Sequence, residues 1–186
     1  MIKELVLKNR TYRKFDSSFI IEDQLLIELV ELARISNSAR NAQTLKFIIV
    51  NNEMKDEVFS TLKWAGALTD WDGPTPEERP SSYIIICNDE SLNYYNAIDV
   101  GIMTQSILLG AVEQGLGACQ FGAFSKSRVS EILDLEDHLK PVSILAIGKP
   151  TEVIKLVDVK DGVSYYRKDG VHYVPKRSLE DILIKK

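Results

Sequence analysis

Cysteine, long apolar runs and surplus positive charge are all scarce in this 186-residue sequence. Its two cysteines, Cys87 and Cys119, each lie in an apolar run without the spacing of a disulfide framework or a metal site. No run reaches the ~18 apolar residues of a membrane span, and the charged N-terminus is unlike a secretory signal. We therefore expect a cytoplasmic protein with no membrane partner and no bound metal.

The balance of charge is acidic, with a net charge of −4. A polynucleotide needs a broad cationic face, so this balance argues against a nucleic-acid partner. Any cluster of cations must then be a local pocket. The length and the 45% hydrophobic content suit one domain spanning residues 1–186.

Hydrophobic periodicity predicts alternating helices and strands. Helical spacing predicts helices over residues 23–35, 96–114 and 127–135. Short runs, most of them rich in β-branched residues, predict strands over residues 45–50, 82–87, 117–121 and 142–148. We expect an α+β fold with a sheet of at least four strands.

The last third of the chain changes character. Residues 163–175 alternate aromatic with polar side chains around Asp169 and Gly170, which predicts a hairpin with a type I′ turn. Ser178 and Asp181 have the spacing of a capping box, which predicts a short final helix over residues 179–184.

The helix predicted over residues 96–114 carries apolar side chains around much of its circumference. Such a helix must be covered on most sides by other protein. A second copy of the chain would provide that cover. The alternative is an ordinary central core helix within one chain.

Two cationic clusters lie near opposite ends of the sequence. Arg10, Thr11 and Arg13 combine two planar guanidinium groups with a hydroxyl donor, a set suited to phosphate oxygens. Alone, this segment is better interpreted as a solvated basic stretch. Lys176 and Arg177 precede the capped final helix, where cations and helix amides point the same way.

Two further segments have the character of ligand-binding loops. Residues 37–44 form a polar loop of Asn, Ser and Gln leading into a buried strand, and such loops hold donors for a ligand on a rigid frame. The alternative is a plain helix terminator. Glycines bracket the strand at 117–121, and they would permit the close approach of a flat ring. The alternative is that they only form simple turns. Together with the cations, these segments indicate a binding site.

With these segments in view, the chain resembles the nitroreductase family of flavin enzymes nearly from end to end. The family segment R-[ST]-x-R-x-F, whose side chains bind the phosphate, ribityl chain and pyrimidine edge of FMN, is similar to Arg10, Thr11, Arg13 and Phe15. The family strand G-L-G-x-C resembles residues 115–119, and the resemblance implies that the backbone near Phe121 and Gly122 approaches the flavin ring.

The resemblance extends to the polar loop and the C-terminus. A family loop P-S-x-x-N-x-Q-P-W corresponds to residues 37–45 without its prolines and tryptophan, and it implies flavin contacts from Ser38, Ala39, Arg40 and Asn41. The family's basic pair resembles Lys176 and Arg177, which would complete the phosphate site.

The resemblance also implies a fold and an assembly. Members of the family fold as a three-layer α/β/α sandwich with a mainly antiparallel central sheet. They are usually interlocked homodimers with FMN at the subunit boundary. The segment over residues 63–80 is similar to a compact subgroup that lacks a long helical insertion.

The chemistry that the resemblance implies belongs to the flavin. NADH or NADPH delivers hydride, leaves, and is replaced by a nitroaromatic, quinone or similar acceptor. Arg13 is the candidate for stabilising negative charge at N1 and O2 of the reduced ring. The sequence does not choose between the two nicotinamides.

The two tryptophans have two possible roles, and the two histidines are expected to have none in the site. Trp64 and Trp71 lie in a loop over residues 64–80 and either cover the flavin as a substrate lid or only pin a surface loop. His138 and His172 fall in polar surroundings, so we expect both at the surface.

Three classes of function remain compatible with the sequence. The favoured one is an FMN-dependent NAD(P)H oxidoreductase. The second keeps the fold but removes halogens reductively or fragments the flavin with oxygen. The third is a flavin-binding or structural protein without turnover, which a colourless preparation that ignores FMN would favour.

Overall fold

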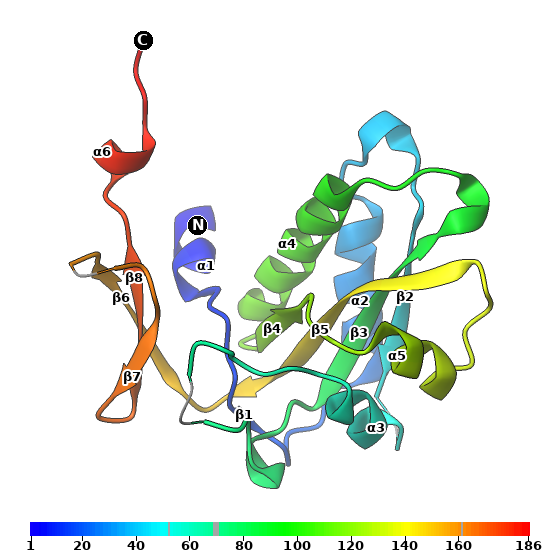
Figure 1. Ribbon diagram of the computed structural model, residues 1–186, viewed down its shortest axis with the longest axis horizontal. Helices are drawn as coiled ribbons and strands as arrows, with labels where there is room; N and C mark the ends of the chain where they lie inside the picture. The colour runs from blue at the N-terminus through cyan, green and yellow to red at the C-terminus, as the bar shows by residue number, and fades with distance from the viewer. Residues whose placement is uncertain (52, 69–70, 161) are drawn as a thin grey trace.

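The computed structural model describes all residues except 52, 69, 70 and 161. Its centre is a sheet in the order β1-β5-β3-β2, with β4 also pairing β5 (Figure 1). Every ladder in this sheet is antiparallel. The strands are β1 (Phe15–Asp16), β2 (Leu45–Val50), β3 (Ser82–Asp89), β4 (Gly117–Phe121) and β5 (Leu139–Pro150).

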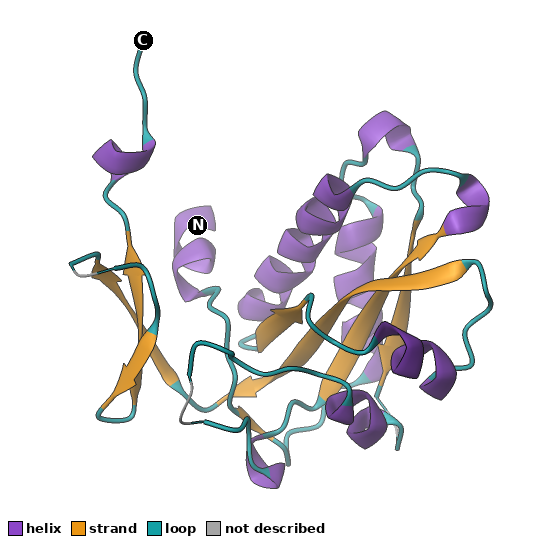
Figure 2. Ribbon diagram, in the orientation of Figure 1, coloured by secondary structure: helices purple, strands orange, loops and turns teal. Residues whose placement is uncertain are grey.

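Helices cover both faces of the central sheet, so the fold has three layers (Figure 2). On β3, Ile84 and Ile86 pack into the core beneath α2 (Asp23–Arg34) and α4 (Ala97–Glu113). The alternate residues Tyr83, Ile85 and Cys87 pack on the other face, with α3 (Lys55–Ser60) and α5 (Lys126–Ile132). Successive side chains of a strand point to opposite faces, which explains the division into two cores. The predicted α+β fold with a three-layer sandwich is confirmed.

A second, smaller sheet follows the sandwich. Its order is β6-β8-β7, with β8 (Val171–Lys176) parallel to β6 (Val153–Asp158) and antiparallel to β7 (Tyr166–Lys168). Asp169 and Gly170 have φ angles of 51° and 75°, as a type I′ turn requires. The predicted hairpin is therefore confirmed.

The C-terminal helix begins with the predicted capping box. Ser178 accepts a hydrogen bond from the backbone of Asp181 and its own backbone donates to the Asp181 carboxylate. This helix, α6 (Leu179–Ile182), projects away from the sandwich (Figure 1). It ends two residues before the predicted boundary.

The predicted bounds of the sheet are accurate where the strand is short. Residues 45–50 and 117–121 are strands β2 and β4 as predicted, whereas β3 and β5 extend beyond the predicted residues. The sequence patterns did not predict α1 (Ile2–Lys8), β1, α3 or β6. The loop at residues 64–80 contains a short helix, η2 (Pro76–Glu78), and its residues 69 and 70 lie outside the described part. The remaining short helices are η1 (Ala39–Asn41) and η3 (Glu90–Leu92).

Helix α4 is covered on only part of its circumference. Its Gly110 lies against α2, where an added Cβ would collide with the Leu32 side chain. Elsewhere on the helix, Ile98 is 69% exposed and Ile102 is 38% exposed. Within one chain, α4 therefore packs in the core as the alternative interpretation has it, but leaves part of its apolar surface uncovered.

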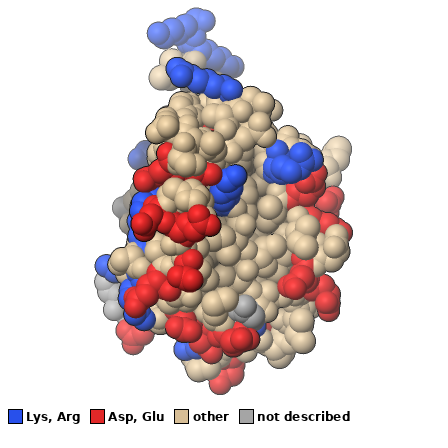
Figure 3. Space-filling model, turned by 90° about the vertical axis from the view of Figure 1, so that its right-hand side faces the viewer, with Lys and Arg blue, Asp and Glu red and all other residues tan. Residues whose placement is uncertain are grey.

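The surface agrees with the acidic composition. Figure 3 shows one face on which acidic side chains predominate around a broad uncharged area, while basic side chains gather at the top, the level of the C-terminal tail in Figure 1. No helix in the described ranges combines the length and apolar character needed to cross a bilayer.

Candidate active site

A cavity of about 370 Å³ lies between the N-terminal segment, α4, β4 and β8. Its volume falls within the roughly 300–1,000 Å³ typical of small-molecule sites. Its lining joins residues from distant parts of the chain: Val6, Asn9, Arg10, Thr11, Arg13, Gln105, Leu108, Ala118, Gln120, Tyr165, His172, Val174 and Lys176.

Strand periodicity explains much of this lining. On β8, His172, Val174 and Lys176 are alternate residues, so their side chains share one face. On β4, Ala118 and Gln120 have the same relationship. Thr11 forms a parallel bridge with Ala118, which holds the N-terminal segment beside the sheet. The cavity therefore forms where three extended segments meet.

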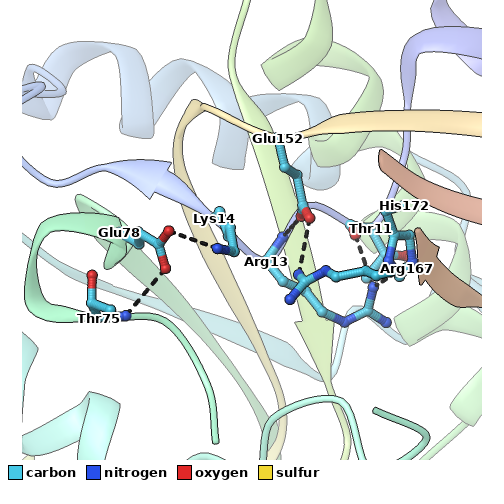
Figure 4. Close-up of polar contacts among 8 residues, drawn as sticks. All are labelled: Thr11, Arg13, Lys14, Thr75, Glu78, Glu152, Arg167 and His172. Atoms are coloured by element: carbon cyan, nitrogen blue, oxygen red, sulfur yellow. Dashed lines mark hydrogen bonds and ion pairs between the residues drawn. The ribbon is translucent and has the colours of Figure 1, made fainter. Parts of the chain in front are cut away.

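Arg13 is the most buried cation of the site, with 9% of the residue exposed. Its Nη1 donates to the Thr11 carbonyl at 3.1 Å and lies 3.4 Å from His172 Nε2 (Figure 4). Its Cζ lies 4.6 Å from the centroid of the Tyr165 ring. The guanidinium is thus fixed from several sides while it lines the cavity.

A buried carboxylate joins the N-terminal segment to the hairpin. Glu152, whose side chain is 5% exposed, accepts a hydrogen bond from the backbone N–H of Arg13 and another from Arg167 Nη2 at 3.0 Å (Figure 4). The Arg167 guanidinium in turn lies 4.2 Å from the centroid of the Trp71 ring. The chain of contacts therefore extends from the cavity cation to the loop at residues 64–80.

The other predicted phosphate ligands lie around the same cavity. Arg10 donates from Nη2 to the Val6 carbonyl at 2.6 Å, while its buried Nε has no partner among the described residues. Burial lowers the pKa of the Arg10 guanidinium, and the nearby Tyr12 opposes that shift. Lys176 lines the cavity, whereas the exposed Arg177 does not. The structure thus brings together Arg10, Thr11, Arg13 and Lys176.

His172 is not at the surface, so that prediction is wrong. The residue is only 2% exposed, and its Nδ1 is buried without a described partner. Burial lowers the pKa of the imidazole, and the positive charges of Arg13 and Arg167 lower it further, while Glu152 opposes them. The alternation of β8 was a usable signal, since His172 shares its face with Lys176.

The predicted polar loop lies away from this cavity. Ser38, Ala39, Arg40 and Asn41 lie at η1, between α2 and β2, and none of them lines the cavity. Arg40 and Asn41 have φ angles of 56° and 52°, a left-handed conformation that non-glycine residues adopt rarely and often at functional sites. One chain alone therefore does not bring this loop to the N-terminal arginines.

Of the remaining predicted residues, Phe121 and Trp64 belong to the core on the other face of the sheet. Phe121 packs in the core with Trp64, their ring centroids 4.7 Å apart, and Trp64 also contacts Trp71 at 6.3 Å. Gly122 is exposed just beyond β4. None of these four residues lines the cavity, although Trp71 is connected to it through Arg167.

Neither cysteine has the environment of a reactive thiolate. Burial raises the pKa of Cys87 to about 11 and that of Cys119 to about 12. Both thiols are therefore protonated and packed in the core. In the described ranges, no three His, Cys, Asp or Glu side chains gather into a group that could hold a metal ion.

Most of the chain matches a known protein family. Residues 6–149 match the model of the Nitroreductase family. The chain belongs to the nitroreductase family. The matched segment includes Arg10, Thr11 and Arg13 and extends to the end of the central sheet. The small sheet that supplies His172 and Lys176 lies beyond it.

Relatives of known name resemble this nitroreductase-family chain over most of its length. A protein of Methanothermobacter thermautotrophicus, whose name carries the terms NADH dehydrogenase and NAD(P)H nitroreductase, is 28% identical over 158 residues, covering 81% of this chain and 78% of that protein. The FMN reductase (NADPH) of Bacillus subtilis is 22% identical over 165 residues, covering 81% of this chain and 66% of that protein.

Solved structures share the fold. A nitroreductase family protein of Streptococcus pneumoniae TIGR4 has a TM-score of 0.71 at 17% identity, with both chains covered completely. One from Clostridium difficile 630 has a TM-score of 0.66 at 21% identity, covering 81% of this chain and 84% of that chain. The resemblance to these structures is in architecture.

Proposed function

We propose that this nitroreductase-family enzyme uses FMN to pass hydride from NADH or NADPH to nitroaromatic, quinone or similar acceptors. The observation that carries the proposal is the set of cavity cations. Arg10, Arg13 and Lys176 line one cavity, and none forms an ion pair within the described part of the chain. Unpaired cations around a concave site favour an anionic ligand.

The donor set fits a flavin nucleotide. The buried and unpartnered Nε of Arg10 is a hydrogen-bond donor that a phosphate oxygen would satisfy. Lys176 adds a second charge at the same cavity, and Val6, Leu108 and Val174 supply apolar surface for a flat ring. Cations for a phosphate and apolar walls for a ring are the two features that FMN requires.

FMN, when bound, would accept hydride from the nicotinamide and deliver it to the acceptor. The residues of the chain would do the rest. Arg10, Thr11 and Lys176 would hold the phosphate and ribityl end, while Arg13 would place a fixed positive charge where negative charge develops on the ring. A fixed cation inside a partly dry cavity stabilises such charge more than solvent does.

We propose that the enzyme works as a homodimer with FMN at the subunit boundary. Large apolar side chains are exposed on three elements: Ile2, Val6 and Leu7 on α1, Ile98 and Ile102 on α4, and Leu179, Ile182, Leu183 and Ile184 in and after α6. Such patches are typical of protein interfaces. A second copy would cover them, and it would bring its own Ser38–Asn41 loop toward a cavity that this loop does not reach within one chain. Light scattering should then give twice the chain mass.

Named relatives support the same reaction class. The B. subtilis protein is called an FMN reductase (NADPH), and a Vibrio harveyi protein, 23% identical over 167 residues, is called an NADPH-flavin oxidoreductase. This chain covers 66% and 65% of those two proteins, so their acceptors are not carried over.

A titration of purified protein tests the proposal. The protein is saturated with FMN, freed of excess, and mixed anaerobically with NADH or NADPH. We expect retained flavin whose visible absorption band is bleached by at least one nicotinamide and restored by a nitroaromatic or a quinone. A retained flavin that neither nicotinamide bleaches would favour another flavin chemistry. Protein that does not bind FMN at all would refute the proposal.

A further inference from the structure

The guanidinium of Arg13 is held by neutral groups only. Thr11 contributes a backbone carbonyl at 3.1 Å, His172 a ring nitrogen at 3.4 Å, and Tyr165 an aromatic face at 4.6 Å. No carboxylate in the described residues forms an ion pair with this guanidinium. The site therefore fixes the direction of the cation without neutralising its charge.

The nearby carboxylate is engaged elsewhere. Glu152 accepts from the backbone N–H of Arg13 and forms an ion pair with Arg167. In both contacts the partner of the carboxylate is a group other than the Arg13 side chain. The side chain thus remains a cation that a ligand in the cavity can use.

The chemistry of the contact defines the protonation of His172. Arginine has five N–H donors and no acceptor, so the imidazole Nε2 must accept in its contact with Arg13 Nη1. The ring is then neutral and carries its proton on Nδ1. The groups that face the ring agree with this state. Arg13 from the N-terminal segment and Arg167 from β7 outweigh Glu152, and with burial they lower the pKa of His172.

We propose that His172 is a positioning residue for Arg13: its neutral Nε2 orients the guanidinium toward the ligand in the cavity. This inference rests on the proposed function, since the ligand considered is FMN. Protonation would turn the acceptor into a donor facing a cation. The contact would then be lost, and the two like charges would repel each other.

Two substitutions separate the acceptor from the bulk of the ring. In His172→Gln the side-chain oxygen reproduces a neutral acceptor near the position of Nε2, whereas His172→Phe keeps a ring without an acceptor. The dissociation constant of FMN from apoprotein, followed by flavin fluorescence at pH 8, should rise roughly 10-fold in His172→Phe and less than about 3-fold in His172→Gln. Equal losses in both variants, or none in either, would overturn the proposal.

A double-mutant cycle distinguishes positioning from general packing. If His172 acts through Arg13, His172→Phe should weaken FMN binding much less in an Arg13→Ala background than in the parent protein. The same loss in both backgrounds would mean that the ring supports the fold without orienting Arg13. Circular dichroism of every apoprotein establishes that the compared variants are folded.

The pH dependence of FMN binding tests the same role with the conservative variant His172→Gln alone. As the pH falls from 8 to 5, the parent should lose more affinity for FMN than His172→Gln does, because only the parent has an acceptor that can be protonated. The phosphate of FMN also titrates, with a second pKa of about 6, but it does so equally in both proteins. Parallel pH profiles for the two proteins would refute the proposal.

These results also separate this inference from the proposed function. Failure of the parent protein to bind FMN would refute the function. Normal binding by the parent together with a refuting pattern in the variants would leave the function intact and remove only the role of His172.

Discussion

The carboxylate of Asp99 accepts a hydrogen bond at 2.9 Å from the backbone N–H of Ala39, sixty residues earlier in the chain. Asp99 belongs to the first turn of α4 and is 2% exposed. It therefore links the start of that helix to the loop in which the sequence predicts flavin contacts. A carboxylate in the first helical turn is also favourably placed relative to the helix dipole.

Removing this carboxylate should release the loop. Asp99→Ala leaves the partly buried N–H of Ala39 without this partner, and we expect a loss of about 1–3 kcal/mol in the free energy of unfolding. Asp99→Asn retains an acceptor oxygen and should lose less. Urea denaturation of both variants measures the difference, with the exposed Asp137→Ala as control. Equal losses in the Ala and Asn variants would contradict this account of the loop.

Arg13→Ala should weaken FMN binding by roughly 10- to 100-fold, because hydrogen bonds to charged groups contribute about 1.5–3 kcal/mol. Fluorescence titration of apoprotein with FMN measures the change. Arg128→Ala is the matched control, since Arg128 is exposed and lies outside the cavity. A dissociation constant equal to that of the parent would remove Arg13 from the flavin site.

Glu152→Gln should lower the stability of the protein. The substitution keeps the size of the side chain but removes the charge that pairs with the half-buried Arg167, and we expect a loss of about 1–3 kcal/mol. The exposed pair of Glu31 and Arg34 provides the contrast, since Glu31→Gln should leave the denaturation midpoint unchanged. Similar midpoints for the two variants would show that Glu152 is no more important than a surface carboxylate.

Stability of the apoprotein should fall as the pH drops below about 6.5, the ordinary pKa of histidine. The pKa of His172 is lowered in the folded state, so the unfolded chain binds more protons in this range. His172→Gln should flatten the decrease between pH 7.5 and pH 5.5. Denaturant midpoints at the two pH values test this. An undiminished slope in His172→Gln would place the titrating group elsewhere.

Local patterns in the sequence predicted most of the central sheet. Strands β2 and β4 are short, apolar and bounded by polar residues or glycine, so their ends coincide with the ends of the pattern. Strand β5 was underestimated because its first three residues include Pro141, which interrupts the pattern without ending the strand. Helix α1 is mostly exposed and has no buried residue, so packing does not mark it in the sequence.

The cavity was harder to predict than the elements that form it. The family motif pointed to Arg10, Thr11 and Arg13, and the capping box drew attention to Lys176, but neither pattern reveals what lies between them. His172 was misjudged because alternation with aromatic residues is also typical of an exposed hairpin. Its burial depends on packing near Arg13, a contact 159 residues away in the sequence. Local sequence patterns likewise do not predict the pairing of β6 with β8.

The distance along the chain between Arg13 and His172 has a consequence for biosynthesis. A ribosome that adds roughly 5–20 residues per second takes about 8–30 s to advance the 159 positions from Arg13 to His172. Throughout that interval the nascent chain contains the early arginines but lacks the cavity residues His172 and Lys176. Under the proposed function, the complete site for the flavin therefore forms only after the hairpin has been translated.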